Sequence, residues 1–188
     1  MLHFAHPRSA LAALALAAIP MALTAQPAAP AAPATPADGY AIHVTAPHVY
    51  QGHASEPVHH WCKPIAPDPI IVCQLFNTNE PGAPLMGVEY IVAKTLTRPA
   101  VSLGTWNANF HDHALEIATG RVQVHGLPAD EAKKVADLVA TTDGIIFHLW
   151  PDGDRFPTGT VAIDQAVGHT PMTAQAYSAS AKPAAPSR

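Results

Sequence analysis

Two short apolar blocks near the middle of the chain, residues 70–76 and 85–92, have the composition of β-strands. Residues 77–82 lie between them and are rich in Asn, Pro and Gly, which favour turns. In the second block three residues alternate with others and share one face, as in a strand: Val88, Tyr90 and Val92. The pattern predicts a hairpin with a long loop.

A helical pattern begins at Pro128, a residue that suits the first position of a helix. Asp130 and Glu131 follow it, where the positive end of the helix dipole favours acidic side chains. Residues at helical spacing then continue until Gly144: Ala132, Val135, Leu138, Val139 and Thr142. We therefore predict a helix that packs through this face.

Further β-like patterns flank this helix. Residues 115–117 and 122–124 surround Thr119-Gly120, which predicts a second hairpin with glycine supplying a positive φ angle. Residues 145–150 predict a strand that ends in the turn 151–154. The expected fold is α+β, a single domain with an antiparallel β-sheet and at least one packed α-helix.

The N-terminal 25 residues have the composition of a signal peptide. Arg8 precedes an Ala- and Leu-rich stretch, and small residues precede Gln26, so we predict cleavage there and a periplasmic or secreted protein. An uncleaved membrane anchor is the alternative, because Leu23 is an imperfect residue at its distance from the cut.

The rest of the chain divides by composition. Residues 26–39 are an Ala/Pro-rich linker and residues 171–188 a similar tail, and both are predicted to be disordered because they have little to bury. Residues 40–170 form the predicted domain, with no transmembrane span after signal removal. The net charge is −4 and no basic run is present, so a nucleic-acid partner is not expected.

The most informative side chains lie in residues 106–117. In an extended strand alternate side chains share a face, so His111 and His113 are predicted to project together while Asp112 and Glu116 point the other way. Glu116 is an odd number of positions from His111. Only a bulge or bend after His113 would bring Glu116 to the pair.

Two neighbouring imidazoles form half of a metal site. The candidates for a third ligand are His59 or His60, Cys62 and His148. Adjacent strand residues face opposite ways, so at most one of His59 and His60 joins a given site. Imidazole and thiolate suit zinc, copper or iron, and an open position would let bound water react. Glu89 and Glu116 are candidate partners of the ligands or general bases.

The alternative, which we favour, is a structural hydrogen-bond network, because twelve histidines make neighbouring pairs common by chance. Five are interpreted as ordinary: His43, His48, His53, His125 and His169. Glu89 either faces solvent or is a buried carboxylate with a partner, and only the second would be functional. The tryptophans either wall a pocket or, as we favour, are core aromatics with backbone partners: Trp61, Trp106 and Trp150.

Cys62 and Cys73 are the chain's two cysteines. In an exported protein they most simply form a disulfide. A metal thiolate at Cys62 and two free buried thiols are the alternatives.

Five motifs stand in this order: His59-His60-Trp61-Cys62, Val72-Cys73-Gln74-Leu75-Phe76, residues 85–92, Trp106 with residues 111–116, and Phe147-His148-Leu149-Trp150 followed by Pro157-Thr158-Gly159. Together they resemble the oil body-associated protein family over about residues 57 to 163. The resemblance implies association with seed lipid droplets for the plant members. It supplies no established reaction, cofactor or catalytic residue.

The predicted export signal departs from the plant members, so their oil-body location is not carried over. The resemblance also implies intracellular relatives with the same cysteine positions, which favours a ligand or packing role for Cys62 because cytosolic thiols stay reduced. Lipid association rests on the resemblance alone, since Lys133 and Lys134 are too few to hold an anionic surface.

The sequence therefore predicts an exported domain of this type that serves as a binding or structural module with a His-rich polar cluster. The alternative is a periplasmic metal-dependent enzyme that uses His111 and His113 with one of the third donors named above. Neither a Gly-rich phosphate loop nor a serine in a nucleophile-elbow setting is present.

Overall fold

The computed structural model describes residues 35–50, 52–150 and 156–181. The predicted signal peptide, most of the linker and the predicted turn at 151–154 lie outside the described residues. The described strands are β1 (Ile42–Tyr50), β2 (His53–Ala66), β3 (Ile70–Phe76), β4 (Gly87–Ala93), β5 (His111–Asp112), β6 (Gln123–His125), β7 (Thr142–His148) and β8 (Ala162–Ala166). The described helices are α1 (Lys94–Ala100), α2 (Leu103–Asn109), α3 (His113–Ala118), α4 (Ala129–Val139) and α5 (Ala174–Ser180).

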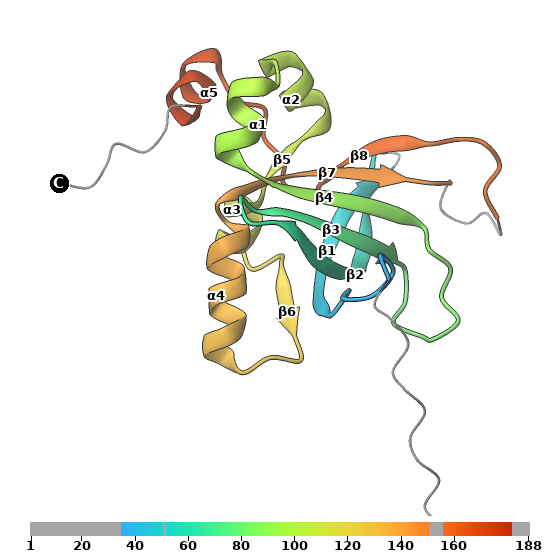
Figure 1. The fold of residues 1–188 in the computed structure, drawn as a ribbon. Coiled ribbons are helices and arrows are strands. Elements are labelled where there is room, and N and C mark those ends of the chain that lie inside the picture. The colour runs from blue at the N-terminus through green and yellow to red at the C-terminus, as the bar shows by residue number, and fades with distance from the viewer. Residues whose placement is uncertain (1–34, 51, 151–155, 182–188) are drawn as a thin grey trace, which may run out of the picture. The chain divides into compact units, whose positions relative to one another are not determined.

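Six of the strands close into an antiparallel barrel (Figure 1). The hydrogen-bonded order is β1–β2–β3–β4–β7–β8, and β8 returns to pair with β1. The two remaining described strands, β6 and β5, pair with the parts of β1 and β7 that β8 leaves unpaired: β6 with β1, and β5 with β7. The predicted α+β fold with an antiparallel sheet is confirmed.

The alternation of side chains along each strand sends one set into the barrel. Val58, His60 and Cys62 alternate on the buried face of β2. On β4, Glu89 lies between the buried residues Gly87 and Ile91. The same period that builds the apolar core therefore also carries polar side chains into it.

The helices lie on two sides of the strands: α1, α2 and α5 above them in Figure 1, and α3 and α4 to their left, with α4 reaching lower. Helix α4 confirms the predicted helix after Pro128, with Asp130 and Glu131 in its first turn. It ends at Val139, and Thr142 already belongs to β7. Among the described residues, no helix combines the length and the apolar character that crossing a membrane requires.

The second predicted hairpin is wrong. Residues 113–118 form α3 instead of a strand, because the Asp112 carboxylate accepts a hydrogen bond from the Ala114 N–H and caps a helix there. Gly120 does take the predicted positive φ, 69°, but it follows a helix.

The predicted disorder of residues 171–188 also fails where the structure describes them. Thr173 caps α5 by accepting a hydrogen bond from the Ala176 N–H. Tyr177 is buried and donates its hydroxyl hydrogen to the Val101 carbonyl oxygen. Alanine is typical of linkers but is also the strongest helix former, and here Tyr177 anchors the helix to the domain.

Cys62 and Cys73 face each other across β2 and β3 and are joined by a disulfide. The favoured interpretation of the cysteines is therefore correct, and both alternatives fail. Cys62 offers no thiolate to a metal.

Candidate functional site

Four imidazoles and two carboxylates meet inside the barrel. They come from five elements: His48 from β1, His60 from β2, Glu89 from β4, His111 from β5, and His113 with Glu116 from α3. Each of the six is between 2% and 4% exposed. We call these six residues the buried cluster. Because buried charges are costly unless they are paired or bind a metal, such a cluster requires a physical explanation.

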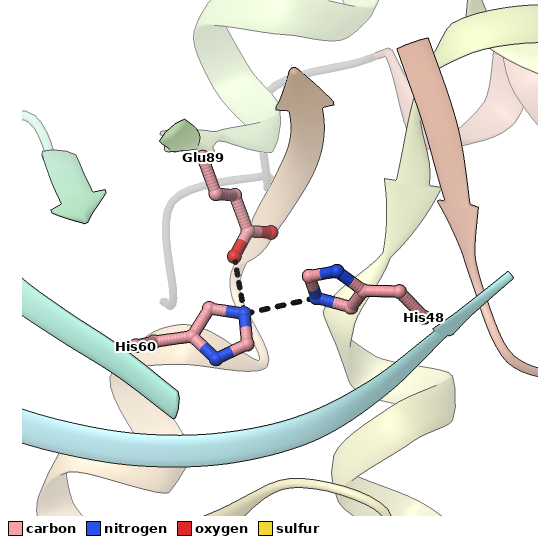
Figure 2. A group of neighbouring side chains, drawn as sticks. All are labelled: His48, His60 and Glu89. Atoms are coloured by element: carbon pink, nitrogen blue, oxygen red, sulfur yellow. Dashed lines mark hydrogen bonds and ion pairs between the residues drawn. The ribbon is translucent and has the colours of Figure 1, made fainter. Parts of the chain in front are cut away.

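Glu89 lies at the centre of the buried cluster. Its Oε1 is 3.1 Å from His111 Nε2 and 3.2 Å from His113 Nε2. Its Oε2 is 3.2 Å from His60 Nε2, which is 3.0 Å from His48 Nε2 (Figure 2). The sequence is compatible with Glu89 on the solvent face or buried with a partner, and in the structure it is buried with partners.

His111 and His113 converge as predicted, with their Nε2 atoms 3.2 Å apart. The route differs from the prediction, because β5 ends at Asp112 and α3 begins at His113. This change from strand to helix is the bend that was needed to bring Glu116 to the two histidines. Glu116 Oε2 lies 3.5 Å from His111 Nε2 and 3.9 Å from His113 Nε2.

Hydrogen bonds outside the cluster fix the tautomers of two histidines. His113 Nδ1 lies 2.9 Å from the Thr142 hydroxyl oxygen, whose own hydrogen is donated to the Val139 carbonyl at 2.6 Å. The Nδ1 of His113 must therefore carry the proton. His60 Nδ1 donates to the Val58 carbonyl oxygen at 2.9 Å. When these rings are neutral, both Nε2 atoms direct a lone pair into the cluster, as in histidines that bind metals.

The charges of the cluster are coupled through Glu89. Burial alone would raise the pKa of Glu89, but hydrogen bonds from His111, His113 and His60 outweigh it and hold that pKa well below its usual range. Burial and the charge of His60 hold the pKa of His48 well below its usual range. Burial lowers the pKa of His113, but its hydrogen bond to Glu89 and the charges of Glu89, Glu116 and Asp143 together raise it by more. An ionised carboxylate thus lies at the centre of the cluster, where a cation, either a protonated imidazole or a metal ion, balances its charge.

The buried cluster borders a small cavity of about 20 Å³. Its remaining lining is aliphatic or comes from the disulfide: Val44, Ala46, Cys62, Ile91, Val122 and Val139. This volume is enough for about one water molecule or ion. The tryptophans do not line it. Trp61 donates to the Asn79 side chain, and Trp106 packs near Tyr177, so a tryptophan wall is wrong.

An ion-pair network holds the segment that carries His111 and His113. Arg98 donates to both carboxylate oxygens of Asp143 and to Asp112. Lys94 Nζ is 2.6 Å from Asp112 Oδ1, and Thr97 donates to Asp143. Asp112 lies between the two histidines and caps α3, so α1 fixes the place where the strand becomes a helix.

The other predicted donors lie apart from the cluster. His59 faces outward, and its Nδ1 is 2.9 Å from His43 Nε2. His60 lies in the buried cluster and His59 on the opposite face of β2. His148 is buried beside the cluster, with its ring 5.7 Å from that of His48, and its Nε2 is 3.7 Å from Asp164.

The interpretation of His48 as an ordinary histidine does not hold for its position, because His48 lies in the buried cluster. It lies in the cluster because Val44, Ala46 and His48 alternate on one face of β1. That period of two was the pattern in the sequence that could have identified it.

Comparison with known proteins adds a family. The family model described as "Protein of unknown function (DUF1264)" matches residues 34–182. Oil body-associated protein 1A of Zea mays is 32% identical over 123 residues, covering 62% of this chain and 50% of that protein. Oil body-associated protein 1B of Arabidopsis thaliana is 30% identical over 131 residues, 66% of this chain and 52% of that protein. The chain spans about half the length of these relatives, and no solved structure matches it.

Proposed function

Since the chain belongs to the DUF1264 family, whose description assigns no function, we propose a function from its own buried cluster: the domain binds a divalent transition-metal ion. The proposed ligands are Glu89, His111 and His113, whose candidate ligand atoms all lie within 4.8 Å of one another. Glu116 lies beside them as a fourth donor, through its Oε2.

One observation carries this proposal. The tautomer of His113 is fixed by Thr142, so the neutral ring presents a lone pair to the Glu89 carboxylate 3.2 Å away. Two lone pairs at this distance repel each other unless a proton or a cation lies between them. A metal ion satisfies both at once, together with His111 and Glu116.

The donor set limits the choice of ion. Imidazole and carboxylate suit zinc and iron(II), and two histidines with one carboxylate are a common arrangement for both. The disulfide removes the thiolates that would favour copper(I). We therefore propose zinc or iron(II).

A binding module fits the site better than an enzyme. All the proposed ligands are at most 4% exposed, and a cavity of about 20 Å³ admits no organic substrate. The ion would tie β4 to β5 and α3 in the interior. A metal-dependent enzyme is the second candidate. It is supported by Glu116, a buried carboxylate beside the proposed ligands that could act as a general base on a small molecule bound to the ion.

Replacing His111 and His113 together by alanine should abolish metal binding at this group, because two of the three proposed ligands are lost. We expect wild-type protein to keep zinc or iron through dialysis and the double variant to keep at least one equivalent per chain less, as measured by elemental analysis. Saturating metal should raise the wild-type free energy of unfolding by about 2.7 kcal/mol at a hundredfold excess over Kd, and raise that of the variant by less.

The matched control is the double variant His43→Ala with His59→Ala. These histidines also lie in contact, with 2.9 Å between their nitrogens, but on the outer face of β1 and β2. The control should bind metal as wild type does. Equal metal content in both double variants would contradict the proposal.

We also propose that the protein is exported. The composition of residues 1–25 supports this, and so does the Cys62–Cys73 disulfide, because such bonds persist in oxidising compartments. Mass spectrometry of protein expressed with its own N-terminus should find a mature chain that begins at Gln26 outside the cytoplasm. Full-length protein retained in the cytoplasm would refute export. The relatives' names place those proteins with oil bodies, and nothing in the buried cluster extends this to the present chain.

A further inference from the structure

We propose that the buried cluster holds two metal ions bridged by Glu89. The first ion is the one proposed above, and the second lies between His48, His60 and the other oxygen of Glu89. This inference rests on the proposed function, since the second ion shares a ligand with the first.

The two oxygens of Glu89 face different pairs of histidines. Oε1 lies 3.1 Å and 3.2 Å from the Nε2 atoms of His111 and His113. Oε2 lies 3.2 Å from His60 Nε2, and in Figure 2 it is this oxygen that points to His60 while the other points away. A carboxylate whose two oxygens face different pairs of histidines has the geometry of a bridging ligand, with one oxygen bound to each ion.

His48 and His60 form the second pair. Their Nε2 atoms are 3.0 Å apart, and with Glu89 they form a second group of three potential ligands within 4.8 Å of one another. The two rings are perpendicular, with an interplanar angle of 79°, so they do not stack and their nitrogens converge edge to edge. These are separate side chains from the first pair, on β1 and β2.

Hydrogen bonding without an ion leaves this second group unsatisfied. His60 Nδ1 donates to the Val58 carbonyl, so a neutral His60 has only a lone pair at Nε2. That lone pair faces the acceptor Glu89 Oε2. A doubly protonated His60 would have a single hydrogen at Nε2 to share between Glu89 and His48. A cation takes lone pairs from all three groups together.

Each ion would then receive two imidazoles and one Glu89 oxygen, and the first ion would also have Glu116 as a donor. Two-metal sites with a shared ligand place their ions about 3.5–4 Å apart, where both can hold one small bridging ligand such as water or hydroxide. The cavity that both groups border has room for a ligand of that size. The class of ligand implied is therefore a small inorganic molecule.

The test is the number of ions per chain. The full chain is stripped with a chelator, titrated with Co²⁺ and analysed for bound metal. Wild type should bind two equivalents and His48→Ala one. The control His148→Ala, a buried histidine outside both groups, should still bind two. In wild type loaded with Mn²⁺, electron paramagnetic resonance should show two coupled spins, a result that needs no variant.

The outcomes separate the two proposals. One equivalent in wild type, with an uncoupled Mn²⁺ signal, overturns the second ion and leaves the proposed function intact. No bound metal in wild type overturns both. Binding of two equivalents of metal by His48→Ala would also refute this inference, because the second ion would then lie elsewhere.

Discussion

Replacing Arg98 by methionine should lower the free energy of unfolding by roughly 3–5 kcal/mol, because it leaves a buried charge without its partner. Arg98 is 4% exposed and donates to both oxygens of Asp143, which is fully buried. Methionine keeps the apolar stem but supplies no donor. Thr97 alone would then hydrogen-bond to the Asp143 carboxylate.

Urea unfolding of the variant measures this loss. Lys133→Met is the matched control, because Lys133 also pairs with an acidic residue, Asp137, but both side chains are exposed. The control should change stability little, as exposed pairs do. An Arg98→Met variant as stable as the control would contradict the role of this network.

The same network predicts a pH dependence. Burial raises the pKa of Asp112, but Lys94 and Arg98 outweigh it, so the folded-state pKa lies below the ordinary 3.8. The stabilisation is therefore present above that value and is lost as the pH falls through the lower folded-state pKa. Arg98→Met should reduce this acid-dependent part of the stability.

Replacing Gly144 by alanine should lower metal affinity on the order of 100-fold or more without removing a ligand. Gly144 pairs with His111 across β5 and β7. A Cβ added there would overlap His111 Nε2 and Glu89 Oε1. The β7 backbone at Gly144 cannot yield, so the His111 imidazole and the Glu89 carboxylate must move. Metal-ligand geometry tolerates a displacement of only about 0.5 Å.

Isothermal titration of the stripped protein with zinc measures this effect. Gly104→Ala is the matched control, since a Cβ at Gly104 meets nothing within 4 Å and lies in helix α2. Alanine favours a helix over glycine, so the control should fold at least as well as wild type and bind zinc normally. Unchanged affinity in Gly144→Ala would show that the ion does not lie between His111 and Glu89.

Much of the site was predictable from local pattern, and the remainder depended on closure of the barrel. The spacing of His111 and His113 identified them as a pair, although α3 rather than a strand turns the second one inward. The sequence does not readily place His48 in a strand, because Pro47 precedes it and a proline argues against a central strand. In the structure the pairing of β1 with β2 shifts register after Pro47, which accommodates the proline.

The short helices were hidden for a different reason. Helices α1, α2 and α3 are six or seven residues long, too short for a helical period to stand out. They are fixed by long-range contacts instead, such as those of Arg98 in α1 with Asp143 in β7. The helical pattern predicts that Gly144 ends a helix. In the structure Gly144 lies inside β7, where a glycine marks a close approach, here of His111 and Glu89.

The metal content of the wild-type chain tests the central claim most directly. Protein purified from its native compartment and dialysed without chelator should retain at least one equivalent of zinc or iron per chain, and chelation should lower its Tm. Protein that carries no stoichiometric metal, and whose Tm does not respond to added zinc or iron, would contradict the claim that the buried cluster is a metal centre.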